Sequence, residues 1–186
     1  MMARPGREGQ RRRGDANDAD WLLDWLLIGN KSAADERFLE RNGIQSVLSC
    51  CERTVKPSRI ESALPDSVRT CVLPLRDLPE EQLQPFLQNA WDFLAEALVW
   101  CLIHLYAGSS RSCAIALSYL IGCEGLPLRD AWERLCERRP GARPNRGFAQ
   151  QLIDLDRAVH GCTSVWVPKG ATVRHAHRVR HRPPTQ

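Results

Sequence analysis

Long apolar runs are missing from this sequence. A transmembrane helix needs about 18 or more consecutive apolar residues, and no such run is present, so we expect no membrane span. Residues 1–14 also lack an apolar stretch and are rich in arginine, which argues against a secretory signal peptide. The acidic residues in and just after this segment, and its lack of serine, argue against an organelle-import peptide as well.

Paired cysteines of the kind that bind zinc are absent too. The chain has eight cysteines, but none forms a Cys-x-x-Cys pair, and the Cys/His clusters of a zinc site are missing. Most of the cysteines fall within apolar runs, a pattern typical of reduced, buried thiols in a cytoplasmic or nuclear protein. We therefore expect no metal site, no cofactor and a cytoplasmic or nuclear location.

Charge is distributed unevenly. Residues 1–14 carry five arginines and one glutamate, and residues 163–186 carry four arginines, one lysine and no acidic residue, whereas the net charge of the whole chain is only +4. The segment between them is therefore mildly acidic. A length of 186 residues with 43% hydrophobic residues suits one folded domain. We expect a disordered basic tail over 1–18, a folded domain over 19–162 and a basic tail over 163–186.

Strand-like and helix-like segments alternate within the expected domain. The candidate strands are 25–29, 45–49, 70–74 and 99–104, and the candidate helices are 32–42, 82–98, 110–123, 129–138 and 144–160. The segment 82–98 has the clearest helical spacing of apolar residues, and Pro85 falls in its first turn, where proline is tolerated. This alternation predicts an α/β fold around a largely parallel sheet.

The segment 104–112 has the composition of a phosphate-binding loop. It follows an apolar run, contains a glycine and several serines, and reaches an arginine just before a helix-like segment. Successive backbone N–H groups can point into such a loop, the following helix N-terminus adds partial positive charge, and the arginine can bind phosphate oxygens in a bidentate manner. The predicted phosphate-binding residues are His104, Tyr106, Ala107, Gly108, Ser109, Ser110 and Arg111.

The same segment, His-Leu-Tyr-Ala-Gly-Ser-Ser-Arg-Ser, resembles the signature loop of the cysteine-dependent protein tyrosine phosphatases, in the form typical of the dual-specificity branch. In that family the residue after the histidine is the nucleophilic cysteine. Here it is Leu105, separated from Arg111 by five residues as in the family pattern. Leucine has no lone pair and cannot form the phosphoryl-enzyme intermediate. The resemblance implies a dual-specificity-phosphatase-like fold, a central mixed, largely parallel sheet flanked by helices, without its nucleophile.

Further motifs extend the resemblance over about residues 20–160. The segment 76–79 resembles the family's general-acid loop, with Asp77 as the acid. Residues 25–49 resemble the opening strand, first helix and next strand, and residues 139–152 resemble the closing helix motif. One departure lies at residues 96–100, where relatives place a glycine-containing turn and this chain has neither glycine nor proline. We expect a tighter turn or a reshaped helix end there.

The motif residues differ in how far their roles can be assigned. Arg111 is predicted to bind phosphate, with a surface arginine as the alternative. The resemblance implies that Ser112 would assist a thiolate, so its remaining role would be loop hydrogen bonding or helix capping. Asp77 is either a relic general acid or an acidic residue that favours the next helix start. His104 is expected to be a hydrogen-bonded structural histidine, and Gly108 to supply unusual backbone geometry.

The remaining loop and turn residues receive structural roles. Ser109 and Ser110 are expected to act through their backbone N–H groups rather than their hydroxyls, and Pro144 and Asn145 to fix the turn into the last helix. Neither Cys101, upstream in the strand, nor Cys113, inside the following helix, can take the place of the missing nucleophile, because in-line attack needs the reacting atoms about 3–3.5 Å apart.

Three functions are compatible with these patterns. The favoured one is a pseudophosphatase, a catalytically inactive dual-specificity phosphatase-like protein that binds phosphoproteins or scaffolds signalling proteins. The second is an active dual-specificity phosphatase that dephosphorylates phosphotyrosine and phosphoserine or phosphothreonine by another mechanism. The third is a nucleic-acid-associated protein that contacts phosphate backbones through its basic tails.

Overall fold

The structure is a computed structural model that describes residues 18–51, 63–97, 100–104 and 108–165. Most of the two predicted basic tails therefore lies outside the described residues, and so do Leu105, Tyr106 and Ala107 of the predicted phosphate loop. The described elements begin with β1 at Ala19 and end with α6 at His160.

A five-stranded sheet forms the centre of the fold, with strand order β1-β2-β5-β3-β4. The strands are β1 (Ala19–Trp21), β2 (Leu26–Gly29), β3 (Ser46–Cys51), β4 (Arg69–Pro74) and β5 (Cys101–His104). Strand β1 pairs with β2 in the antiparallel direction, and the other pairs are parallel. The predicted mixed, largely parallel sheet is therefore confirmed, although the short edge strand β1 was not among the predicted strands.

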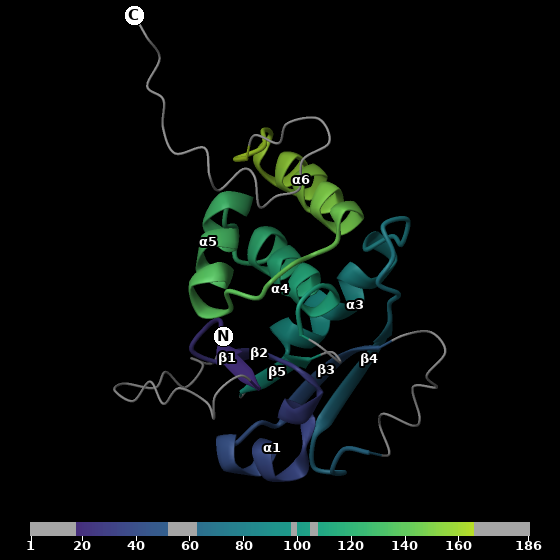
Figure 1. The fold of residues 1–186 in the computed structure, drawn as a ribbon, viewed down its shortest axis with the longest axis vertical. Coiled ribbons are helices and arrows are strands. Elements are labelled where there is room, and N and C mark those ends of the chain that lie inside the picture. Colours follow the sequence, from purple (N-terminus) through teal and green to yellow (C-terminus); the bar gives the residue numbers. More distant parts are fainter. Residues whose placement is uncertain (1–17, 52–62, 98–99, 105–107, 166–186) are drawn as a thin grey trace, which may run out of the picture.

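Helices cover both faces of this sheet, as Figure 1 shows. They are the short 3₁₀ helix η1 (Lys31–Ala34), α1 (Glu36–Asn42), α3 (Gln84–Ala95), α4 (Arg111–Gly122), α5 (Leu128–Arg138) and α6 (Arg146–His160). Successive side chains of a strand point to opposite faces, so Leu26 and Ile28 pack with α3–α6 while Leu27 packs with η1 and α1.

Helix α4 lies at the centre of the helical layer. Its residues from Arg111 to Ile121 are all buried, which is the pattern of a helix surrounded by protein on every side. It packs against α3, α5 and α6 and against the sheet. Because neighbours enclose it, the start of α4 is held in a fixed position behind the carboxyl end of β5.

Helix α3 ends earlier than the sequence pattern indicates. The predicted helix ran to residue 98, but α3 ends at Ala95. The Glu96 N–H bonds to the carbonyls of Asp92 and Leu94, and the Ala97 N–H bonds to the Leu94 carbonyl. These short-range bonds close the end of α3, and Ala97 is only 1% exposed. The reshaped helix end expected at this point is therefore present at Glu96 and Ala97.

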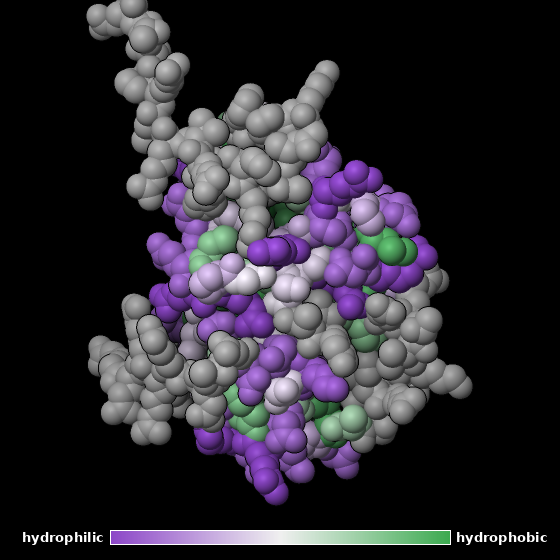
Figure 2. All heavy atoms as spheres, viewed as in Figure 1, coloured by the Kyte–Doolittle hydropathy of each residue, from purple (hydrophilic) through white to green (hydrophobic). Residues whose placement is uncertain are grey.

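The described surface is mostly hydrophilic on the face seen in Figure 2, with hydrophobic residues in small separate groups. Among the described residues, the exposed large hydrophobic side chains are Leu78 and Val159. None of the helices in the described part of the chain is both long and apolar enough to cross a membrane.

A buried carboxylate fastens the residues that follow α6. Asp156 accepts hydrogen bonds from the N–H groups of Leu128 and Ser164, from the hydroxyls of Thr163 and Ser164, and from the His160 ring. Although burial alone raises a carboxyl pKa, these bonds outweigh it and hold the pKa of Asp156 below its usual value. Thr163 and Ser164, which the sequence pattern assigned to the tail, are therefore bonded to α6 through Asp156.

We expect Asp156→Asn to destabilise the domain by roughly 2–3 kcal/mol, because the new amide presents donors to groups that also donate. The matched control is Asp154→Asn on the same helix, whose carboxylate makes exposed contacts with Gln150 and Arg157. Urea unfolding followed by circular dichroism measures both variants. Equal losses of stability would show that Asp156 is not the fastening point.

Candidate phosphate-binding site

The candidate site lies where β5 passes into α4, at the carboxyl edge of the parallel strands. Gly108 has a φ of 63°, in the left-handed region, as the predicted unusual geometry requires. A Cβ atom there would lie 2.5 Å from Gly29 O and 2.6 Å from Arg139 Nη2, so only glycine fits. The N–H of Ala114 donates to Ser110 O at 2.9 Å, which ties the first turn of α4 to the loop.

Arg111 is buried, which rules out the alternative of a surface arginine. The residue is 7% exposed, and its Nη1 donates to the Leu75 carbonyl at 3.0 Å. This bond ties the first residue of α4 to the end of β4. The N-terminus of a helix favours anions, so a guanidinium held there repels the helix dipole unless an anion lies between them. Arg111 and the loop amides together suit a phosphate group.

Asp77 is bound to the phosphate loop by hydrogen bonds. Its Oδ1 accepts from the Ser110 hydroxyl at 2.6 Å and from Asn145 Nδ2 at 2.9 Å. The Ser110 Oγ in turn accepts from the Asn145 N–H at 3.1 Å. The Ser110 hydroxyl therefore takes part in holding the loop, in addition to the role expected of its N–H group. Asp77 therefore links the loop that carries it to the phosphate loop and to the start of α6.

The loop that carries Asp77 is fastened to α6 on its other side. Gln151 Nε2 donates to the Glu81 carbonyl at 2.8 Å, and the Leu83 N–H donates to Gln151 Oε1 at 2.7 Å. The Glu81 carboxylate, almost fully buried, pairs with Arg76 Nε. Asn145 also caps α6 by accepting from the Phe148 N–H, which confirms its predicted role at this turn. The loop that carries Asp77 is therefore fixed by hydrogen bonds at both of its ends.

His104 is a buried, hydrogen-bonded histidine, as predicted. Its Nε2 lies 2.7 Å from the Ser49 hydroxyl on the neighbouring strand β3, and burial lowers the pKa of the ring to about 4. The ring is therefore neutral at physiological pH. Its Nδ1 makes no hydrogen bond with a described residue.

Ser112 lies in the first turn of α4 and is 0% exposed. Its hydroxyl makes no hydrogen bond to any residue that the structure describes, and the N-cap position belongs to Ser110, which makes no side-chain capping bond. Helix capping by Ser112 is therefore wrong. A buried hydroxyl of this kind is expected to have a hydrogen-bond partner. The resemblance to the phosphatases implies that this partner would be the sulfur of the nucleophile.

The thiols nearest the loop are not activated. Burial raises the pKa of Cys113 to about 12, and it raises the pKa of Cys50 further still. Burial also raises the pKa of Cys51. A thiol is a nucleophile only as its thiolate, so these side chains do not supply one at neutral pH.

Residues distant in sequence complete the site, and sequence reasoning missed them. Ser49 holds His104, Gln151 holds the acid loop, and Arg139 and Asp20 hold the loop backbone. The closing motif includes Arg139 and Gln151, but a motif does not show which atoms they contact. Among the described residues no group of three or more potential metal-ligating side chains is found.

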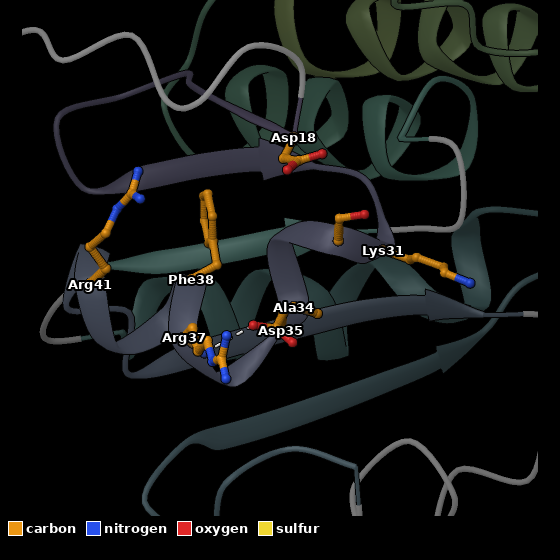
Figure 3. Close-up of a pocket in the computed structure, with 8 residues that line it drawn as sticks. Asp18, Lys31, Ala34, Asp35, Arg37, Phe38 and Arg41 are labelled. Atoms are coloured by element: carbon orange, nitrogen blue, oxygen red, sulfur yellow. Dashed lines mark hydrogen bonds between the residues drawn. The ribbon is translucent and has the colours of Figure 1, made fainter.

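A separate hollow of about 780 Å³ lies beside η1 and α1 (Figure 3). Its lining combines the acids Asp18 and Asp35 with the cations Lys31, Arg37 and Arg41, next to Phe38. Asp35 serves as the N-cap of α1, and Asp18 accepts from Asn30. Its acids and cations largely offset one another, and none of the phosphate-loop residues lines it, so this hollow is not the candidate site.

Comparison with known proteins places this site in a family. A sequence model of the dual specificity phosphatase catalytic domain matches residues 26–158. Dual specificity protein phosphatase PHS1 of Arabidopsis thaliana is 32% identical over 154 residues, which cover 80% of this chain and 16% of that protein. The chain spans about a fifth of the length of the first curated relatives it matches.

Two solved structures are similar over most of the fold. The human tyrosine phosphatase-like serine/threonine/tyrosine-interacting protein is 26% identical, with a TM-score of 0.67 over 78% of this chain and 99% of that one. A mouse putative dual specificity phosphatase, complexed with zinc tungstate, is 26% identical, with a TM-score of 0.69 over 82% of this chain and 94% of that one. The chain belongs to the dual specificity phosphatase family, through a domain that contains the whole β5–α4 loop and the Asp77 loop.

We predict that His104 makes the domain acid-labile. Its pKa is about 4 when folded and about 6.5 when unfolded, so the unfolded state binds more protons between these values. The contribution of the neutral His104 to the free energy of unfolding is fully present above pH 6.5 and decreases as the pH falls. Below about pH 4 this contribution, of up to about 3 kcal/mol, is lost. Urea unfolding at several pH values should show this slope, and His104→Gln should flatten it.

His160 provides the control, because its shift has the opposite sign. A hydrogen bond to the Gly125 carbonyl, together with Asp156, raises the pKa of His160. Its contribution is present at low pH and is lost as the pH rises through the raised value. His160→Gln should therefore leave the acid slope assigned to His104 in place. A slope that persists in His104→Gln and vanishes in His160→Gln would contradict the assignment.

Proposed function

We propose that this domain is a pseudophosphatase, which binds phosphorylated protein side chains at the β5–α4 loop and does not hydrolyse them. The observation that carries the proposal is Leu105 at the family's nucleophile position, separated by five residues from the buried Arg111. Covalent catalysis in this family needs a sulfur nucleophile at that position, and leucine supplies no lone pair.

The groups around the loop support retained binding. Gly108 has a φ of 63°, in the left-handed region used by anion-binding loops, and Arg111 is anchored by the Leu75 carbonyl at the N-terminus of α4. The Asp77 carboxylate accepts from Ser110 and Asn145 and so holds the loop in place. A general acid has no use when no phosphoryl transfer precedes it.

The alternative is an active dual specificity phosphatase, which is favoured by the names of most of its relatives. The tyrosine phosphatase-like interacting protein among the similar structures shows that this fold is not always named as an enzyme. For this chain, activity would need a nucleophile other than residue 105, and the raised thiol pKa values near the loop oppose that.

We predict that the native chain releases no phosphate from an aryl phosphate above a buffer blank. Leu105→Cys should gain at least slow turnover, because the buried Ser112 hydroxyl, Arg111 and Asp77 remain in place. Phosphate release by purified proteins measures both. Arg111→Ala in the Leu105→Cys background is the control and should abolish the gain. Native activity that disappears in Arg111→Ala would contradict the pseudophosphatase proposal.

Phosphoproteins or signalling proteins are the proposed partners, and the cytoplasm or nucleus is the proposed location. The basic segments 1–14 and 166–186 are candidates for a localisation signal or for a surface that contacts a polyanion. Contact with a polyanion is the basis of the nucleic-acid alternative.

We predict that deleting both segments changes localisation or salt-dependent retention on a polyanion column. The melting temperature should hardly move, since the deletion keeps residues 163–165, which bond to Asp156. A longer deletion that also removes residues 163–165 is the control and should lower the melting temperature. Unchanged localisation and unchanged retention after the first deletion would exclude both roles for the segments.

A further inference from the structure

The carbonyls of the phosphate loop are held from outside by the α5–α6 connection. Arg139 Nε donates to Gly108 O at 2.6 Å, and the Arg143 N–H donates to Ser109 O at 2.6 Å. In a trans peptide the carbonyl and the N–H of the next residue point in opposite directions. Holding these two carbonyls therefore turns the N–H groups of Ser109 and Ser110 toward the inside of the loop.

Arg139 is well placed to fix this backbone. It follows the last turn of α5, is 9% exposed, and its own N–H bonds to the Leu135 carbonyl. A Cβ atom on Gly108 would lie 2.6 Å from Arg139 Nη2 and 2.5 Å from Gly29 O, so neither group leaves room for a side chain at this position. The guanidinium and the end of β2 therefore both pack closely against the loop backbone at Gly108.

Asp20 holds the guanidinium in turn. Arg139 Nη1 donates to Asp20 Oδ2 at 2.8 Å, and the two residues are 119 positions apart in the sequence. Asp20 lies in the edge strand β1, and its side chain is 36% exposed. A planar guanidinium can donate to a carbonyl and to a carboxylate at once, whereas the point charge of a lysine cannot span both.

We propose that Arg139 is a positioning residue for the phosphate loop and that Asp20 orients it. Arg139 acts through the 108–109 peptide and does not touch the anion. This inference rests on the proposed phosphate binding, and it adds that the edge strand β1 sets the affinity of a site to which it contributes no ligand.

The opposite explanation, that Arg139 acts only through its charge, makes different predictions. Under that explanation Arg139→Lys keeps the affinity for an anion, and Asp20→Asn raises it because a negative charge near the site is removed. Positioning predicts a loss in both variants, since each breaks the link between β1 and the loop carbonyl. The sign of the Asp20→Asn effect therefore separates the two.

The test is calorimetric titration with tungstate, a tetrahedral oxyanion of phosphate shape, in the full chain carrying Leu105→Gly. That background removes the branched side chain from the nucleophile position, so tungstate binding is expected to be measurable. Adding Arg139→Gln or Arg139→Lys should weaken binding about tenfold or more, and Asp20→Asn should weaken it severalfold. Arg134→Gln, which removes the same charge from an exposed position on α5, is the matched control and should change binding little.

Amide chemical shifts of Ser109 and Ser110 in the unliganded proteins give a second readout. They should move in Arg139→Lys and in Asp20→Asn and stay unchanged in Arg134→Gln. An Asp20→Asn variant that binds more tightly, or an Arg139→Lys variant that matches its parent in affinity and in these shifts, would overturn the inference. If the Leu105→Gly parent binds no tungstate, the proposed function fails, and the amide shifts still decide whether Arg139 positions the loop.

Discussion

A guanidinium buried at the positive end of a helix is the constraint on which the rest of this site depends. Arg111 begins α4, is fixed to the Leu75 carbonyl, and lies where the helix dipole disfavours a cation. Protein contacts hold it in this position, and the phosphate proposed to bind there would compensate its charge. The enclosed position of α4, the glycine at 108 and the bond from Arg139 to the Gly108 carbonyl restrain the loop backbone beside this cation.

The hydrogen bonds around that point connect the loop to the whole domain. Asp77 connects the loop to the segment after β4, and Asn145 connects it to the start of α6. Asp20 connects it, through Arg139, to the edge strand β1. Each of these bonds fixes geometry, and none requires a proton to move. The neutral, buried His104 fits the same description, because it supports the loop strand through Ser49. A site built in this way suits binding, and Leu105 at the nucleophile position is the reason to assign it binding without turnover.

Local patterns predicted the parts of the structure that local physics decides. The apolar runs of β2 to β5, the positive φ of Gly108 and the cap at Asn145 follow from short stretches of sequence. Strand β1 escaped prediction because it has three residues with Asp20 in the middle. The bonds of Ser110 to Asp77 and of Arg139 to Asp20 join residues 33 and 119 positions apart, and no periodicity marks such pairs. The packing of Ser164 onto Asp156 was missed for the same kind of reason.

The central claim is that phosphate recognition survives without phosphate transfer. Its most direct test is a titration of the purified chain and of Leu105→Gly with phosphotyrosine and phosphothreonine peptides and their unphosphorylated counterparts, with phosphate release followed in the same samples. We expect weak phosphate-dependent binding by the native chain, tighter binding by Leu105→Gly, loss of that gain on adding Arg111→Ala, and no release in any sample. Equal affinity for phosphorylated and unphosphorylated peptides in both proteins, or Arg111-dependent phosphate release by the native chain, would contradict the claim.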